Sequence, residues 1–292
     1  MKKFILGVLS FLLILLIFNG VVLSFANLHY YKNYDKKPSK NYSSFIMSDS
    51  HGLPIGDFSE EFNVYNFSAG SDSYFDIERK IKYLIENDYK IDTIYMTVDD
   101  HALSPHREHA NNLDRSVIYS SEDEYDSHFS YLREKYIKYY LAIFQPRVRT
   151  LFKQYLKENF KHIYIKKNDN PNKDVPWYKL SENERIKRVE IRKQAQFGSE
   201  FKSKKLEETL IEIINLCRMN KIELIGIKFP IPNTYVKILG DKNFGADKVL
   251  LSYGVTVIDS KLIFIDHNEY FKNTDHMNSK GGKIFTKILL DK

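Results

Sequence analysis

The feature that most constrains this chain is an uncharged, strongly apolar stretch from Phe4 to Ala26, which follows Lys2 and Lys3. About 20 apolar residues in a helix are enough to cross the hydrocarbon core of a bilayer, so this stretch predicts a transmembrane helix. Lysines before the stretch and few basic residues directly after it favour an N-terminus on the inside. We therefore expect a single-pass membrane protein whose body lies outside the cytoplasm.

A cleaved signal peptide is the alternative interpretation, with the small residues of Ser24–Ala26 as the cleavage site. The apolar run is longer than the 7–15 residues that are usual in signal peptides, and this favours an uncleaved signal anchor over residues 1–26. Residues 27–41 are polar and aromatic and include Pro38, so they predict a short linker. The folded domain is expected to occupy residues 42–292.

The composition of the chain limits its class. Its 292 residues are 43% hydrophobic, which is enough for the core of one large domain. The net charge of +6 comes from basic residues scattered among acidic ones, so we expect no nucleic-acid partner. Cys217 is the single cysteine and is expected on a buried helix face. A disulfide within the chain and a cysteine-based zinc site are both excluded.

Beyond the linker, short apolar segments alternate with helical patterns. This alternation is typical of a parallel sheet covered by helices on both faces, a three-layer α/β/α domain. Residues 104–201 are too long for one crossover, so we expect a helical insertion there. The predicted strands are 43–48, 62–69, 91–98, 222–230 and 255–259, and the predicted helices are 73–90, 122–160 with an interruption at Pro146, 182–220 and 279–292.

Ligands of parallel α/β sheets bind beyond the carboxyl ends of the strands, so reactive residues are sought there. Three predicted strands end in polar segments, and a fourth polar segment precedes the last helix. The four segments read SDSHG, NFSAGSDS, TVDDHALS and FKNTDHMNSKGG.

These four segments, in this order, resemble the sequence blocks of the SGNH/GDSL hydrolase superfamily. Ser50 matches its nucleophile, Gly70 matches a glycine whose N–H binds the oxyanion, and His276 matches its base. The chain departs from the family where Ser48 replaces the first glycine, where TVDD replaces Gly-x-Asn-Asp, and where Asn273 replaces the acid three residues before the histidine. The resemblance extends over residues 42–292, although about 30 residues carry it, and it implies a flavodoxin-like fold.

The chemistry of the matched residues agrees with this resemblance. A serine hydroxyl needs a base within hydrogen-bond reach, and His276 can accept its proton and return it to the leaving group. A third group must hold the imidazole in one tautomer. Asp275, Asn273 or a backbone carbonyl could do this, and we expect Asp275 to matter more than Asn273.

The oxyanion that forms during acyl transfer needs hydrogen-bond donors. The N–H groups of Ser50 and Gly70 are the expected donors, with Asp100 or His101 in place of the missing asparagine. Asp100 could donate only if it were protonated. His51 is expected to shape the turn after the first strand.

A metal site is a further possibility that the sequence raises, because His101, His106 and His109 are close together in the chain. Pro105 breaks any helix there and no cysteine supports the group, so we expect neither a metal nor a cofactor.

Together these features predict a membrane-anchored, extracytoplasmic serine esterase or O-acyltransferase that acts on a cell-envelope glycan. The ending DHMNSKGG before an amphipathic helix resembles envelope-associated members of the superfamily. The expected partners are an acylated envelope glycan or acyl donor, the membrane, and a membrane acyl-transfer protein. Two alternatives stay open: a catalytically inactive glycan-binding or assembly protein, and a lipase.

Overall fold

The computed structural model describes residues 1–32, 34, 36–161 and 175–291, and the chain divides into two compact units. The first unit combines Met1–Lys37 with Asp114–Pro171, and the second combines Pro38–Leu113 with Asn172–Lys292. The central part of the predicted insertion, residues 104–201, therefore belongs with the N-terminal helix, and both of its ends belong to the second unit. Residues 162–174 of that insertion lie outside the described residues.

The second unit contains a sheet of five strands that all run parallel, in the order β2-β1-β3-β4-β5. This is the flavodoxin-like order, and it confirms the predicted fold class. Each strand is shorter than its predicted apolar segment, because the flanking residues continue into loops. The strands are β1 Ser44–Met47, β2 Val64–Asn66, β3 Thr93–Thr97, β4 Glu223–Lys228 and β5 Thr256–Asp259.

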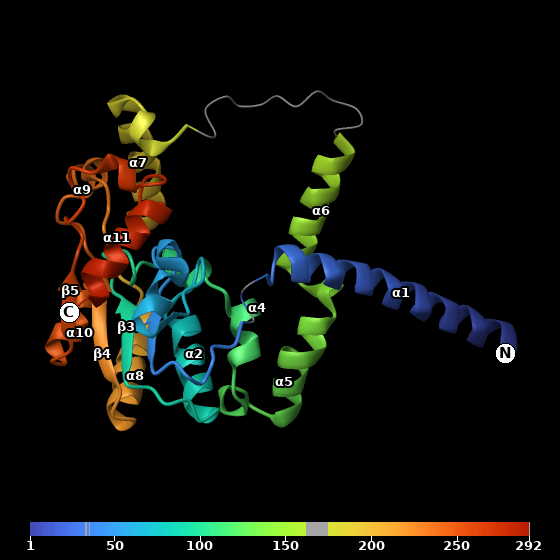
Figure 1. Ribbon diagram of the computed structural model, residues 1–292. Coiled ribbons are helices and arrows are strands. Elements are labelled where there is room, and N and C mark those ends of the chain that lie inside the picture. Colours follow the sequence, from blue (N-terminus) through green and yellow to red (C-terminus); the bar gives the residue numbers. More distant parts are fainter. Residues whose placement is uncertain (33, 35, 162–174, 292) are drawn as a thin grey trace. The chain divides into compact units, whose positions relative to one another are not determined.

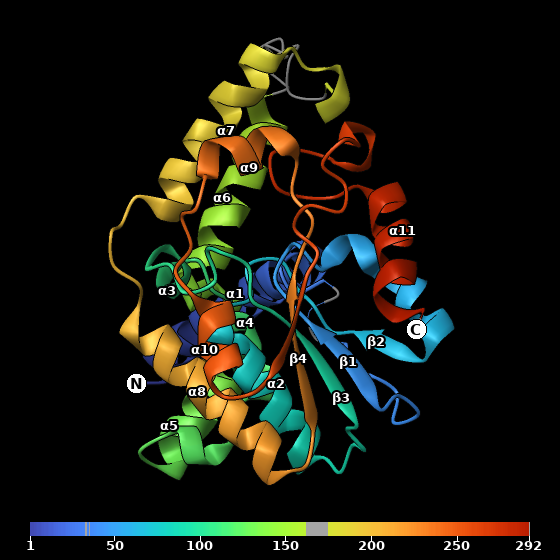
Figure 2. The same cartoon turned by 90° about the vertical axis from the view of Figure 1, so that its left-hand side faces the viewer.

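Helices cover both faces of this sheet (Figure 2). On one face α2 (Tyr74–Glu86) packs against α8 (Lys204–Met219), and α10 (Ala246–Ser252) packs beside α8. On the other face α11 (Ser279–Leu290) packs against a 3-10 segment, η1 (Leu53–Phe62), over a core that includes Ile46, Ile227 and Phe285. The remaining elements of this unit are α3 (His106–His109), η6 (Trp177–Lys179), α7 (Glu182–Phe197), α9 (Asn233–Leu239) and η7 (Asn268–Tyr270).

The predicted helix over residues 182–220 is wrong in one respect, because it is two helices, α7 and α8. The break begins at Gly198, where a Cβ would lie 2.6 Å from the carbonyl oxygen of Gln194. It ends at Ser203, whose hydroxyl accepts a hydrogen bond from the N–H of Leu206 at 3.1 Å. A serine in this position is a favourable N-cap, so α8 starts there as a separate helix.

The first unit is helical (Figure 1). Its long helix α1 (Lys2–His29) is the one helix among the described residues that is long and apolar enough to cross a membrane. The last turns of α1 pack against η5 and α6 through Val22 and Ala26. The other elements are η2 (Val117–Tyr119), η3 (Glu122–Glu124), α5 (His128–Leu132), η4 (Arg133–Lys138), η5 (Ala142–Phe144) and α6 (Pro146–Lys161), while α4 (Leu113–Ser116) lies at the boundary of the two units.

The predicted interruption at Pro146 lies at a helix start in the structure. The helical path breaks just before it, between η4 and η5, and Pro146 opens α6. Proline is well suited to the first turn of a helix, because an N–H at that position has no partner within the helix.

Two glycines let α11 come close to the rest of the second unit. A Cβ at Gly282 would lie 1.9 Å from the carbonyl oxygen of Pro54 in η1, and one at Gly281 would lie 2.4 Å from that of Tyr270. Asn278 caps the same turn, because its side-chain oxygen accepts from the N–H of Gly281 at 3.0 Å. The loop before α11 is thereby held close to η1, the segment that follows β1.

We expect Gly282→Ala to lower the free energy of unfolding by about 1–3 kcal/mol, because the added methyl group meets backbone rather than a movable side chain. Chemical denaturation can be followed through the fluorescence of Trp177, which is the only tryptophan and is buried in the second unit. Gly70→Ala is the matched control, since a Cβ there meets nothing closer than Leu53 at 3.7 Å. Equal destabilisation by the two substitutions would contradict the close-packing argument.

Candidate active site

Ser50 lies just beyond the end of β1. This strand has β2 on one side and β3 on the other, so its carboxyl end is the topological switch point of the sheet. A tight turn displays it: the side chain of Asp49 accepts from the N–H of His51 at 2.9 Å, and the Asp49 carbonyl accepts from the N–H of Gly52 at 3.2 Å. Gly52 has no room for a side chain, because a Cβ would lie 2.4 Å from the Ser68 hydroxyl. The residues around Ser50 thus form a turn that presents its side chain.

His276 lies next to this serine although 226 positions separate them in the chain. Its Nε2 atom is 2.7 Å from the Ser50 hydroxyl oxygen. Its Nδ1 atom lies 2.9 Å from the side-chain oxygen of Asn273 and 3.0 Å from a carboxylate oxygen of Asp275. With the proton on Nδ1, the ring donates toward these two oxygens, and Nε2 is left to accept from the Ser50 hydroxyl. The structure therefore brings the four predicted catalytic residues together.

Asp275 is the buried member of this group, with 2% of its side chain exposed. Burial alone would raise its pKa, but the hydrogen bonds and charges of His276 and His51 hold the pKa well below its usual range. Its second oxygen accepts from Arg192 at 2.6 Å and from Gln196 at 3.2 Å. Both of these residues come from α7, which carries none of the four sequence blocks, so no motif predicted them.

The side-chain oxygen of Asn273 forms hydrogen bonds with the backbone of its loop as well as with the ring of His276. Besides facing Nδ1, its side-chain oxygen accepts from the backbone N–H groups of Asp275 at 3.3 Å and His276 at 3.1 Å. Local side-chain bonds of this kind fix a turn. The amide therefore holds the turn in which neighbouring residues, Asp275 and His276, both face the site.

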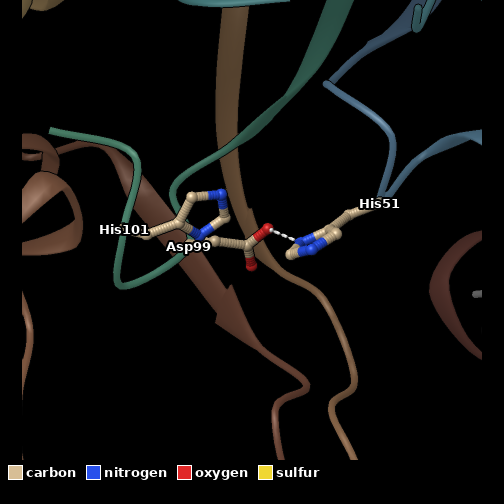
Figure 3. A group of neighbouring side chains, drawn as sticks. All are labelled: His51, Asp99 and His101. Carbon is tan, nitrogen blue, oxygen red and sulfur yellow. Dashed lines mark hydrogen bonds and ion pairs between the residues drawn. The ribbon is translucent and has the colours of Figure 1, made fainter. Parts of the chain in front are cut away.

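Behind the catalytic residues, His51 and Asp99 form a buried pair that the sequence did not assign to the site (Figure 3). His51 Nδ1 lies 2.6 Å from Asp99, whose carboxylate also accepts from the N–H of Phe229 at 2.8 Å. The other ring nitrogen of His51 is 3.6 Å from Asp275. Burial would lower the pKa of His51, but the carboxylates of Asp49 and Asp99 outweigh it and hold the pKa well above its ordinary value. His51 is thus a buried cation between acidic side chains.

The residues expected to replace the missing asparagine lie in the same interior region. The Asp100 carboxylate accepts from Lys228 at 2.7 Å and from Lys261 at 3.0 Å. His101 faces Asp49, with its Nε2 3.4 Å from the carboxylate, and burial lowers the pKa of its imidazole. An oxyanion role for either residue stays a prediction.

Gly70 lies in the loop after β2, and this loop is tied to the end of β1. The N–H of Ala69 donates to the carbonyl of Ser48 at 3.1 Å, and the carbonyl of Gly70 accepts from the side chain of Asn112 at 2.8 Å. These bonds place the loop beside the turn that carries Ser50. The role of the Gly70 N–H as an oxyanion donor stays a prediction.

Two groups of side chains in the described part of the chain have a spacing that could hold a metal ion: His51 with Asp99 and His101, and His51 with Asp275 and His276, each with ligand atoms within 4.8 Å of one another. Neither group contains His106 or His109. In the first group His51 and Asp99 already bond to each other, and in the second group Asp275 contacts both His276 and the guanidinium of Arg192. The donor sets therefore fit a hydrogen-bonded network better than a divalent cation, which prefers ligands without a competing cation.

Two hollows border the site. An open groove of about 490 Å³ lies over η1 and the start of α11; it is lined by Leu53, Pro54, Gly56, Asp57, Phe58, Lys272, Met277, Asn278 and Ser279. Met277 follows His276 directly, and Leu53 is three residues after Ser50, so the groove is lined by the two chain segments that carry the reactive pair. Behind His51 and Asp275 is a cavity of about 20 Å³, which has room for roughly one water molecule.

The buried charge on His51 predicts a pH-dependent stability. In the unfolded chain His51 loses its proton near pH 6.5, whereas the raised pKa keeps the proton in the folded protein. Its stabilising contribution is therefore complete below about pH 6.5 and falls by about 1.4 kcal/mol per pH unit above it, until the folded pKa is passed. We expect the free energy of unfolding of the wild type to exceed that of His51→Asn by an amount that shrinks as pH rises.

Urea denaturation of both proteins between pH 6 and pH 9, followed through Trp177 fluorescence, measures this difference. The lowered pKa values of Asp49 and Asp275 do not interfere, because their contribution changes only when the pH falls through the acidic range. Parallel stability curves for the two proteins would show that His51 does not hold an additional proton in the folded state.

Comparisons with known proteins do not show a family for this chain. No protein-family model and no curated protein matches the chain. Among solved structures, a crystal structure of a "putative acylhydrolase" from Bacteroides fragilis aligns with 90% of this chain and 93% of its own, with a TM-score of 0.40 and 9% sequence identity. The assignment of the site therefore rests on the geometry of this chain.

Proposed function

We propose that this chain is a membrane-anchored serine esterase or O-acyltransferase that acts on an acylated glycan of the cell envelope. The observation that carries the proposal is the 2.7 Å contact between the Ser50 hydroxyl and His276 Nε2, with the other ring nitrogen oriented by Asn273 and Asp275. A nucleophile, a base and a group that orients the base are the parts that acyl transfer through a serine requires. The resemblance to SGNH/GDSL hydrolases assigns the same roles to Ser50 and His276.

The first half of the reaction forms an acyl-enzyme. The Ser50 oxygen attacks the ester carbonyl carbon while His276 Nε2 takes the hydroxyl proton, and the carbonyl oxygen becomes an oxyanion that the N–H groups of Ser50 and Gly70 can bind. When the carbon–oxygen bond of the ester breaks, the proton passes from His276 to the departing sugar oxygen. The acyl group is then bound to Ser50 as an ester.

The second half releases the acyl group by the same route. Water, or a hydroxyl group of a second sugar, gives its proton to His276 as its oxygen attacks the acyl carbon, and Ser50 recovers its proton. Water gives an esterase and a sugar hydroxyl gives an acyltransferase. Both outcomes use the same residues, because only the source of the attacking oxygen differs.

The environment of His276 supports its role as the base. The imidazole becomes a cation each time it takes a proton, and the carboxylate of Asp275 lies 3.0 Å from its Nδ1. Asp275 keeps its negative charge, because hydrogen bonds and nearby cations hold its pKa low. A fixed, buried negative charge beside a developing positive charge stabilises the transition state without reorganisation.

The hollows favour a small acyl group on a polar, extended substrate. The cavity of about 20 Å³ behind the site is far too small for a fatty acyl chain, so a lipase would have to place such a chain in the groove lined by Leu53, Phe58 and Met277. The groove beside the site carries Asp57, Lys272 and the aromatic ring of Phe58. Such a mixture suits a sugar, which offers hydroxyl groups to polar residues and an apolar face to an aromatic ring.

The proposed location follows from α1, which is long and apolar enough to cross a bilayer. We place its N-terminus on the cytoplasmic side, because Lys2 and Lys3 precede the apolar stretch. The catalytic unit would then lie where envelope glycans are found. A reporter enzyme that works only outside the cytoplasm, fused after Lys292, tests this orientation, and activity of a strictly cytoplasmic reporter would overturn it.

The alternative is a protein that binds a glycan without changing it. One observation favours it: Asp100, in the position of the third block, accepts hydrogen bonds from two lysines, whereas a donor to the oxyanion would have to be protonated. Loss of one such donor typically costs about 3 kcal/mol of transition-state stabilisation, which slows an enzyme without abolishing its reaction.

We expect a fluorophosphonate probe to label Ser50 in the wild type, because the hydroxyl is half-buried but accessible and its base lies within reach. Ser50→Ala should lose all labelling. Ser71→Ala, which alters an exposed serine nearby, should keep it. Absence of labelling in folded wild-type protein would favour the inactive alternative.

We expect Asp275→Asn to reduce turnover of a generic acetyl ester far more than Asn273→Ala. An Asp→Asn change in this role cost about 10⁴-fold in a well-studied serine protease, where the wrong histidine tautomer was held. Asn273→Ala removes the side-chain bonds that hold the turn but keeps the Asp275 carboxylate, which lies 3.0 Å from His276 in the wild type, so a smaller loss of turnover is expected. Loss of turnover in Asn273→Ala, with Asp275→Asn still active, would make the amide the orienting group.

A further inference from the structure

Asn19 is a polar residue within the apolar helix α1, and it has defined partners. Its side-chain nitrogen donates to the carbonyl of Tyr140 at 3.0 Å, and its side-chain oxygen accepts from the N–H of Ile143 at 3.3 Å. The carbonyl of Tyr140 lies in the break between η4 and η5, and the N–H of Ile143 lies in the first turn of η5. Asn19 therefore supplies hydrogen bonds where the helical path of the first unit is interrupted.

The position of Asn19 in α1 sets its depth in a bilayer. At 1.5 Å per residue, Asn19 is roughly 24 Å along the helix from Lys3, the last charged residue before the apolar stretch. The hydrocarbon core of a bilayer is about 30 Å thick. With Lys3 at one surface, Asn19 and the chain around Tyr140 that contacts it lie within the opposite leaflet. Irregular backbone at that depth needs partners from the protein, and Asn19 provides them.

The side chains around the break have the character of a lipid-facing surface. Large apolar and aromatic residues are exposed in the segments on both sides of the break, and tyrosines are frequent, as they are at bilayer interfaces. The exposed residues are Phe129, Tyr136, Ile137, Tyr140, Phe144 and Tyr155, with 43–67% of each exposed.

The charge of this segment points to the kind of lipid. Between His128 and Asn159 the chain has seven lysines and arginines but only two glutamates, although the two kinds are nearly balanced over the whole chain. A basic, aromatic and amphipathic segment binds anionic bilayer surfaces, because its basic residues are attracted to the negatively charged headgroups. The basic residues are Arg133, Lys135, Lys138, Arg147, Arg149, Lys153 and Lys157.

We propose that residues 128–159 form a second membrane-binding element, embedded in the bilayer leaflet into which α1 exits and attached to α1 through Asn19. Its partner is a bilayer that contains anionic lipids. This inference goes beyond the proposed function and depends only on α1 as the spanning helix. The segment acts together with α1 as one anchor, with aromatic side chains in the lipid and basic side chains among the headgroups.

Depth measurements test the inference, because α1 alone would keep any variant on the membrane. A single cysteine at Phe144 is labelled with an environment-sensitive fluorophore in the full-length protein, reconstituted in nanodiscs of phosphatidylcholine and phosphatidylglycerol with brominated acyl chains. Native Cys217 adds no signal, because it is buried and burial raises the pKa of its thiol to about 12. A label at Leu13, exposed on α1, is the positive control, and a label at Leu262, 51% exposed in the second unit, is the negative one.

We expect quenching at position 144 to be several-fold greater than at 262 and to approach that at 13. Quenching at 144 equal to that at 262, with 13 strongly quenched, would overturn the second element and leave the α1 anchor intact. Weak quenching at all three positions would overturn both.

The charge argument has its own test. The exposed residues Arg149, Lys153 and Lys157 are changed together to glutamine. Quenching at 144 should then decrease in nanodiscs with phosphatidylglycerol, while quenching at 13 stays the same. An unchanged signal at 144 would overturn the assignment of anionic lipid as the partner.

Discussion

Close backbone packing between α11 and η1 is the constraint on which the candidate site depends. Ser50 follows β1 and His276 precedes α11. Their hydrogen bond therefore requires that two segments more than 200 positions apart be placed relative to each other with a precision of a fraction of an ångström. At Gly282 the backbone of α11 approaches Pro54 so closely that no side chain fits between them. Because η1 begins three residues after Ser50 and α11 begins three residues after His276, this contact fixes the distance between the reactive groups.

A second constraint is the balance of charge behind the site. His51 is a cation between Asp49, Asp99 and Asp275, and Asp275 has Arg192 as a further partner. Removing one member of a buried charge pair typically costs about 3–5 kcal/mol, because the other is left without compensation. The network therefore holds Asp275 ionised and in place beside His276. The reaction needs only the carboxylate of Asp275. The buried cation and the other two acids are explained by the need to compensate each buried charge with another.

The sequence predicted the sheet and the positions of Ser50 and His276, because three blocks followed recognisable strands whose ends converge in a parallel sheet and the fourth preceded the final helix. It did not predict His51 and Asp99 as members of the site. Asp99 and Asp100 lie beyond the end of β3, where the alternation of side chains along a strand no longer predicts which way each one faces. In the structure Asp99 meets His51 and Asp100 meets two lysines. Arg192 and Gln196 come from a helix whose placement depends on tertiary packing, which no local pattern encodes.

The contact between Asn19 and the chain near Tyr140 also determines an order of events during synthesis. The partners are 121 positions apart. At the usual rate of about 5–20 residues per second, α1 leaves the ribosome roughly 6–25 s before the carbonyl of Tyr140 exists. Throughout this interval the side-chain amide of Asn19 has no partner from its own unit. The apolar side chains of α1 must therefore drive its insertion into the membrane without help from that contact. Assembly of the first unit is therefore necessarily late, after the first three strands of the sheet have been made.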